Sequence, residues 1–395
     1  MSEDERRWQP LLTGEQAVRA RDTVHDIVHA LEQQPHSPEQ GFKGDASLAL
    51  VLALCDRSTA GARLESALNA VVSRPATIAL FGGLCGASWT LGQVAQGDET
   101  EELVAHFEAA VLRYLDVPRW EERYDLMSGL AGVGVYAAGR RGGRAAQIAE
   151  RVLSHLEATA IIDDSGATWR TPPQFLAEAR RARFPAGVVD LGVAHGVPGI
   201  IGMLASFVEA DIETDRSHQL LESAVRWLLS AVPSALPRFG TNWPADSEES
   251  KRMGWCYGDP GVAGVLLRAS CALRSPELER EAIELLQQVI APLASRGVPD
   301  ACFCHGAAGL AHIYNVAFQR TGSSQMHAQA ERWLAEVLRA RKPRMGVAGY
   351  TFMKIDDDTR WTNDTTLLSG AAGVALVLLA AIEDRAPEWQ TLFLL

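Results

Sequence analysis

The sequence predicts an all-α protein: an α/α toroid (barrel) of seven helical hairpins, in which an outer ring of helices surrounds an inner ring. Two observations predict this fold. A Gly-x-x-Gly element followed by a long apolar run recurs along the chain. Between the recurrences lie charged segments that carry an apolar stripe at helical period. Repeated two-helix units bury their apolar faces by stacking on neighbours, and a closed ring buries the inner helices on every side.

The Gly-x-x-Gly element marks the start of each predicted inner helix. Its first glycines are Gly83, Gly129, Gly196, Gly258, Gly306 and Gly370, and a degenerate seventh copy begins at Gly44, with Ser47 in place of the second glycine. The mean spacing of about 54 residues suits two helices of roughly 11 to 15 residues plus loops. The glycines fit the N-terminal ends of the inner helices, where they permit unusual backbone angles and close approach. All seven N-termini should therefore face one end of the ring.

The remaining segments are predicted as outer helices and excursions. The outer helices include residues 100–115, 145–158, 277–290 and 324–341. Residues 161–191 and 233–255 contain Pro, Trp and turn residues without helical period, and residues 346–366 resemble them. We expect a single catalytic toroid over residues 1–395, with residues 161–191 as an irregular or β-containing insertion.

Composition and charge restrict the possible functions. The net charge is −12 and Lys and Arg form no long run, which argues against a nucleic-acid partner. The N-terminus lacks the apolar core of a secretion signal, and the apolar stretch 78–95 is broken by four glycines, so we expect a cytoplasmic protein without a membrane span. Six cysteines in that compartment should be reduced. Cys55, Cys85 and Cys271 lie among apolar residues and are expected to be buried.

Reactive side chains share positions when each is numbered by its distance before the first glycine of its repeat. Position −1 holds His195, Tyr257 and His305, and position −2 holds Cys256 and Cys304. Equivalent positions of a ring converge on its axis, and two thiolates with one imidazole form a donor set typical of zinc. Three protein ligands leave the open position that distinguishes catalytic zinc, although His195 is a possible fourth ligand.

A thiolate-rich zinc site favours thiol chemistry. A free thiol has a pKa near 8.5, and metal binding supplies the thiolate at neutral pH. The two anionic sulfurs weaken zinc as a Lewis acid for water, which favours a substrate thiol at the open position. Cys302 has no counterpart in the neighbouring repeat, so we expect it to pack in the core rather than bind the metal.

Three further residues are candidates for the chemistry. His195 can deliver or accept a proton near pH 7, and Asp125, four residues before Gly129, could orient it. Arg252 could hold an oxyanion. His312 and the other histidines are expected to be structural or surface residues.

Four motifs carry a resemblance to a known family. They are YDLMSGLAG at 124–132, AHGVPG at 194–199, WCYGDPG at 255–261 and CHGAAG at 304–309. Together with repeats over nearly the whole chain, they resemble the lanthionine synthetase C (LanC) family, in particular its stand-alone class I lantibiotic cyclases.

The resemblance implies a zinc enzyme that adds peptide cysteine thiols to dehydroalanine or dehydrobutyrine, forming lanthionine and methyllanthionine thioether rings. In that family's pattern, Cys256, Cys304 and His305 bind the zinc ion (Zn2+). His195 protonates the enolate, and Asp125 pairs with His195 or helps to deprotonate the thiol. Arg252 matches an active-site arginine, and Tyr257 matches a tyrosine near the site.

The same resemblance implies partners. The substrate would be a dehydrated precursor peptide with a leader and a core. A dehydratase and an export transporter would complete a biosynthetic complex, which would bring this cytoplasmic protein to the inner membrane surface. The stretch WRTPPQFL in residues 161–191 resembles part of an insertion found in such cyclases.

Three alternatives remain open. Protein prenyltransferase β subunits also activate a thiolate on zinc in an α/α barrel, but the sequence lacks an evident basic cluster for a diphosphate. A LanC-like branch adds glutathione to dehydroamino acids in proteins, and it commonly has His where this chain has Tyr257. A non-catalytic peptide-binding toroid would not need His195 beside an intact ligand set.

Overall fold

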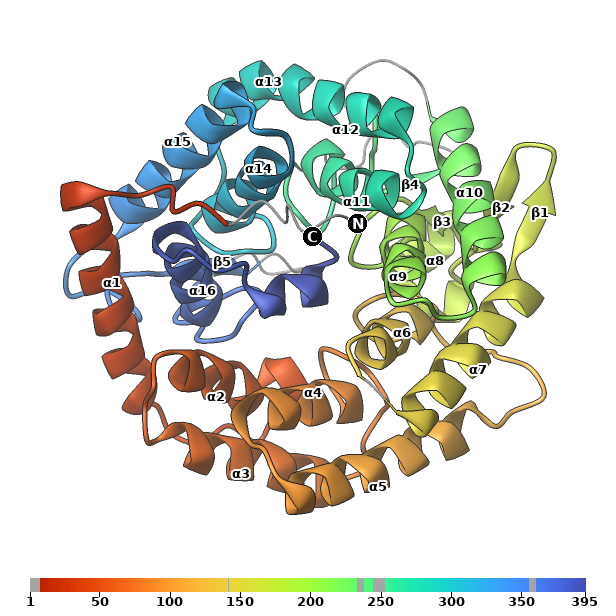
Figure 1. Cartoon of the computed structure of the whole chain (residues 1–395), viewed down its shortest axis with the longest axis horizontal. Coiled ribbons are helices and arrows are strands. Elements are labelled where there is room, and N and C mark those ends of the chain that lie inside the picture. The colour runs from red at the N-terminus through yellow and green to blue at the C-terminus, as the bar shows by residue number, and fades with distance from the viewer. Residues whose placement is uncertain (1–7, 141, 233–237, 244–252, 355–359) are drawn as a thin grey trace.

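The computed structural model describes residues 8–140, 142–232, 238–243, 253–354 and 360–395, and it shows two concentric rings of helices (Figure 1). The inner ring consists of α2 (Asp45–Leu54), α4 (Leu84–Val94), α6 (Leu130–Ala138), α9 (Val197–Glu209), α11 (Asp259–Ala272), α14 (Ala307–Thr321) and α16 (Ala371–Ile382). The outer ring consists of α1 (Gly14–Glu32), α3 (Ala60–Val72), α5 (Asp98–Leu115), α7 (Gly143–Thr159), α10 (Thr214–Ala231), α12 (Pro276–Gln288), α13 (Ile290–Arg296) and α15 (Ser324–Ala340). Each inner helix packs against the next, and α16 packs against α2, so the ring is closed. The predicted α/α toroid is confirmed.

The glycines precede the inner helices as predicted, mainly because the backbone there is crowded. Each first glycine is the residue immediately before its inner helix. A Cβ on Gly132, the second glycine of its pair, would lie 2.2 Å from the carbonyl oxygen of Leu126, closer than van der Waals contact allows. Of the seven first glycines, Gly258 alone has a positive φ, at 101°. Close approach, rather than an unusual backbone angle, is therefore the common reason for the motif.

Main-chain hydrogen bonds join the loops that precede neighbouring inner helices. They link residues at position −2 of successive repeats: Phe81 N–H to Met127 O (3.2 Å), Ala194 N–H to Cys256 O (3.3 Å), Cys256 N–H to Cys304 O (3.1 Å) and Cys304 N–H to Leu368 O (2.9 Å). These bonds fix the positions of the loops relative to one another along the axis of the ring. As a result, position −2 side chains of adjacent repeats lie close together.

The axis of the toroid is filled beneath these loops. Position −3 of six repeats carries a buried apolar side chain: Leu80, Leu126, Val193, Trp255, Phe303 and Leu367. The 3-10 helix η3 (Glu388–Phe393) adds Phe393, whose ring centroid lies 3.9 Å from that of Phe303. Trp255 Nε1 donates to the Phe393 carbonyl at 2.9 Å. The reactive positions −2 and −1 thus lie above a packed aromatic floor.

The ring closes through α1, which packs as the outer partner of α16. Leu11 and Leu12 donate their N–H groups to the carbonyl of Ala381 at 2.9 and 3.0 Å.

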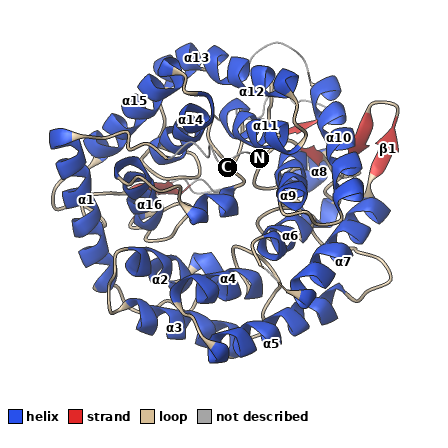
Figure 2. Ribbon diagram, viewed as in Figure 1, coloured by secondary structure: helices blue, strands red, loops and turns tan. Residues whose placement is uncertain are grey.

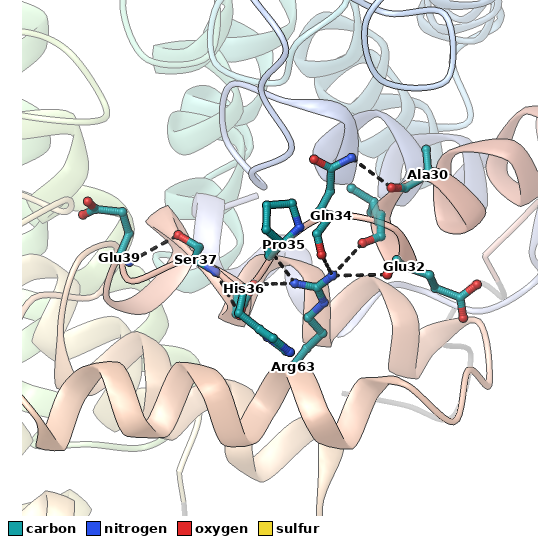
Figure 3. A network of polar contacts seen from close by, with 10 residues as sticks. Ala30, Glu32, Gln34, Pro35, His36, Ser37, Glu39 and Arg63 are labelled. Carbon is teal, nitrogen blue, oxygen red and sulfur yellow. Dashed lines mark hydrogen bonds and ion pairs between the residues drawn. The ribbon is translucent and has the colours of Figure 1, made fainter.

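At the other end of α1, the buried guanidinium of Arg63 on α3 donates to the carbonyls of Leu31, Glu32, Gln34 and Pro35, and Figure 3 shows this network. A cation at these C-terminal carbonyls complements the helix dipole.

The remaining elements are short, and all but η1 belong to the excursions at 161–191, 233–255 and 346–366 (Figure 2). They are η1 (Gly41–Lys43), β1 (Ile161–Asp163), β2 (Gly166–Thr168), η2 (Pro173–Phe175), α8 (Glu178–Arg183), β3 (Val189–Asp190), β4 (Asn242–Trp243), β5 (Phe352–Lys354) and β6 (Arg360–Thr362). The strands pair antiparallel as β1–β2, β3–β4 and β5–β6. The insertion at 161–191 therefore contains strands, as expected, and also a short helix that the sequence pattern does not predict.

Two further expectations are settled by burial. Cys85 is buried, Cys55 is only half-buried, and Cys271 is exposed beside Arg320, so the prediction of a buried thiol holds only in part for Cys55 and is wrong for Cys271. The surrounding apolar residues belong to α11, whose C-terminal end reaches the surface. His312 is fully buried with its ring 4.6 Å from that of Trp389, as expected for a structural histidine. Among the described helices, none is long and apolar enough to cross a membrane.

Candidate active site

The three predicted zinc ligands meet in the structure. One donor atom each from Cys256, Cys304 and His305 can be chosen so that all lie within 4.8 Å of one another. The loops before α11 and α14 supply them, and the bond from Cys256 N–H to the Cys304 carbonyl sets these two loops side by side. Two sulfurs and an imidazole nitrogen at this separation fit a tetrahedral zinc ion with one position left for a substrate.

A second group of donors shares His305. Within the described residues, Asp300, Cys302 and His305 also have donor atoms within 4.8 Å of one another. Burial raises the pKa of the Cys302 thiol well above its usual value, and the nearby Asp300 charge adds to that effect. The sulfur of Cys302 also accepts the His305 main-chain N–H at 3.5 Å. A thiol with a raised pKa is a poor zinc donor, because the thiolate is the form that binds the metal.

His195 and Asp125 form a hydrogen-bonded pair. His195 Nδ1 lies 2.9 Å from Asp125 Oδ2, and Asp125 Oδ1 accepts the Ser128 N–H at 2.7 Å. Burial lowers the pKa of His195, but the hydrogen bond and charge of Asp125, together with the charges of Asp190 and Cys256, outweigh it, so the pKa is raised above its usual value. The arrangement holds Nδ1 toward the carboxylate and leaves Nε2 for proton transfer. In the described part of the chain, His195 belongs to neither donor group, which leaves it outside the candidate ligand set.

Arg123 connects this pair to the insertion. Its guanidinium donates to the Phe175 carbonyl at 2.8 Å, stacks over the Phe175 ring and lies 3.7 Å from the Asp125 carboxylate. The stretch 169–176, WRTPPQFL, therefore lies next to the residues that hold His195.

Tyr257 lies beside His195, with ring centroids 6.4 Å apart, but its hydroxyl donates to Asp190 Oδ2 at 3.0 Å. Burial raises the pKa of Tyr257 well above its usual value, with the Asp190 charge contributing. Burial also raises the pKa of Asp190 to about 6, against the lowering effect of the His195 charge. The sequence reasoning missed Asp190. It occupies position −6 of its repeat, as Asp300 and Asp364 do in theirs, and extending the register count to that position would have found all three.

Arg252, the predicted oxyanion-binding residue, lies outside the described residues. The other six predicted site residues are all placed at the N-terminal end of the inner ring, in the loops before α6, α9, α11 and α14.

These features define a closed helical toroid that gathers thiol, imidazole and carboxylate groups at one end of its axis. The chain belongs to the family described as lanthionine synthetase C-like protein, whose pattern matches residues 11–394. Its structure is similar to that of nisin cyclase, with a TM-score of 0.73 and 17% sequence identity over 95% of this chain and 97% of that chain. At this identity the similarity shows the fold. Family and fold together support a lanthionine-cyclase-like function.

Proposed function

We propose that this protein is a zinc-dependent lanthipeptide cyclase, which joins peptide cysteines to dehydroalanine or dehydrobutyrine as lanthionine or methyllanthionine. The observation that carries the proposal is the meeting of Cys256, Cys304 and His305 beside the His195–Asp125 pair. A donor set for a thiol-activating metal and a positioned proton donor are the two groups that the addition requires.

The donor set fits zinc, so the roles of the ligands follow from their chemistry. Cys256, Cys304 and His305 would hold the ion, and bound zinc would lower the pKa of a substrate thiol and supply it as thiolate at neutral pH. The imidazole of His305 must be neutral to bind, and its Nε2 lies 3.2 Å from the carbonyl of Met353, a suitable acceptor for the remaining N–H.

The residues around the ligands then complete the addition. The substrate thiolate sulfur bonds to Cβ of the dehydroamino acid, the carbon–carbon π bond breaks, and its electrons form an enolate. His195 gives the proton from Nε2 to Cα, which replaces the proton lost by the thiol. Asp125 keeps His195 protonated and oriented, because its carboxylate stabilises the imidazolium. Arg252 would stabilise the enolate oxygen.

The proposed substrate is a dehydrated precursor peptide with its leader. We further propose that the protein works in the cytoplasm, and that a dehydratase and an export transporter bring it to the inner membrane surface. The resemblance to lantibiotic cyclases motivates the proposal of these partners, which purification of a complex from producing cells would test.

The test is direct. Purified protein is incubated with zinc and a dehydrated precursor peptide encoded near its gene, and free thiols are counted by alkylation and mass spectrometry. Loss of one thiol for each ring formed, prevented by removing zinc with a chelator, supports the proposal. Unchanged thiol content with the peptide demonstrably bound contradicts it and points to a peptide-binding toroid. Addition of glutathione instead of ring formation would identify the glutathione-adding branch.

A further inference from the structure

Three repeats carry an aspartate at position −6, and all three aspartates accept the same type of main-chain hydrogen bond. Oδ1 of Asp190, Asp300 and Asp364 accepts the main-chain N–H two residues later, at 2.9, 2.8 and 2.7 Å. This contact closes the turn that leads into the inner helix, and it is structural. Any additional role must come from contacts that differ among the three residues.

Asp300 differs from Asp364 in the use of its second oxygen. Oδ2 of Asp300 accepts the main-chain N–H of Met353 at 2.7 Å and lies 3.8 Å from His305 Nε2. In Asp364, the same Oδ1 that closes the turn also accepts the Thr366 hydroxyl. Asp300 is buried, so its hydrogen bonds are shielded from water and hold their geometry firmly.

Met353 joins Asp300 to His305 through its main chain. Its N–H is bound by Asp300, and its carbonyl oxygen lies 3.2 Å from His305 Nε2. Met353 faces Trp361 in the β5–β6 pair, yet both of its peptide groups bond to the loop before α14. The excursion at 346–366 is therefore fastened to the candidate zinc site at this residue.

A neutral imidazole carries a single N–H, so the partner of one nitrogen decides which nitrogen can bind a metal. An N–H on Nε2 directed at the Met353 carbonyl leaves the lone pair of Nδ1 for the metal. Histidines that bind metals commonly donate their other N–H to a carbonyl or carboxylate, which fixes the ring and raises its basicity.

We propose that Asp300 is a positioning residue for His305: it holds the Met353 peptide, whose carbonyl fixes His305 in the tautomer that binds zinc through Nδ1. This inference rests on the proposed function, since it requires that His305 is a zinc ligand. It assigns the β5–β6 excursion a part in metal binding through main-chain atoms alone.

The experiment measures the zinc dissociation constant of the full chain by competition with a chromophoric chelator. Asp300→Asn keeps an acceptor for the turn but loses one of the two carboxylate oxygens, and zinc binding should weaken about ten- to a hundred-fold. Asp364→Asn makes the same change at the matched turn and should leave the dissociation constant within about two-fold of wild type. Met353→Ala should also bind like wild type, because the link uses only main-chain atoms.

Each outcome has a defined meaning. Equal zinc affinity of wild type and Asp300→Asn overturns the inference while leaving the proposed function intact, and equal weakening in Asp364→Asn reduces Asp300 to a turn residue. A wild-type protein that binds no zinc refutes both proposals. Should Asp300→Asn fail to fold, judged by circular dichroism, Met353→Pro tests the same link from the other side, because it removes the N–H that Asp300 binds. Zinc affinity of Met353→Pro equal to that of wild type would then overturn the inference.

Discussion

Replacing Asp125 by Asn should move the pH profile of ring formation. Asn is close to Asp in shape and can still accept the Ser128 N–H, so the turn before α6 should survive. The change removes the negative charge that lies 2.9 Å from His195 Nδ1. Asp125 contributes the largest influences that raise the pKa of His195, so the pKa should fall when its charge is removed.

The size of the effect follows from the contact and its exposure. Hydrogen bonds between charged groups contribute about 1.5–3 kcal/mol. The His195 side chain is 42% exposed, so solvent screens the pair and the lower end applies. About 1.5 kcal/mol corresponds to roughly one pKa unit, or a ten-fold smaller protonated fraction above the pKa.

The assay is kcat/KM for ring closure of a dehydrated peptide between pH 5.5 and 9. The alkaline limb should move down by about one unit in Asp125→Asn, with about a ten-fold loss at pH 8. His195→Asn should lose productive closure yet retain zinc. An unchanged alkaline limb in Asp125→Asn would refute the proposed pairing.

Stability provides an independent check with a defined sign. The raised pKa of His195 means that the pair stabilises the fold fully below the unfolded pKa of about 6.5, and that this contribution is lost as the pH rises through the folded value. Asp125→Asn should therefore be more destabilised relative to wild type at pH 6 than at pH 9, as measured by urea unfolding.

The remaining predictions concern the metal, the axis and the ring closure. Cys304→Ala should lose zinc stoichiometry and ring formation together, whereas Cys302→Ala should retain zinc, measured by metal analysis; retained zinc in Cys304→Ala would refute the ligand set. Phe393→Ala should cost about 3–5 kcal/mol of unfolding free energy, because it leaves a cavity on the axis of the toroid. The hydrogen bond from Trp255 Nε1 to the carbonyl of residue 393 does not depend on the ring and should remain. A loss below about 1 kcal/mol would show that the cavity collapses. Arg63→Met should cost about 3–5 kcal/mol, because it removes the buried cation paired with Oδ1 of the fully buried Asp45 and leaves His36 on Oδ2 as a remaining partner; an unchanged urea midpoint would contradict that reasoning.

The fold and the site were predictable as far as they depend on the repeat. The register places Cys256 and Cys304 at one position of successive hairpins, and the main-chain bond between them explains physically why that position converges. The glycines and the apolar runs after them predict the inner helices, and each of these helices begins one residue after the first glycine of its repeat.

Features that depend on contacts between distant segments were not predictable. The pairing of β3 with β4 and the filling of the axis by Phe393 join residues with no local pattern in common. Asp190 and Asp300 are different, because both stand at position −6 of their repeats. Counting the register back to that position would have predicted them from the sequence. The exposure of Cys271 depends on where α11 reaches the surface, which local composition does not encode.

The packing of α1 on α16 gives the toroid a seam. Trp8 Nε1 donates to the Ala380 carbonyl across a sequence separation of 372 residues, whereas the other hairpins are contiguous in the chain. Contacts this distant form late, because a long loop must close before they contribute. During synthesis the growing chain would thus be an open horseshoe with apolar inner faces exposed to solvent. The proposed zinc ligands come from neighbouring hairpins, so the candidate metal site could assemble on the horseshoe before the seam is made.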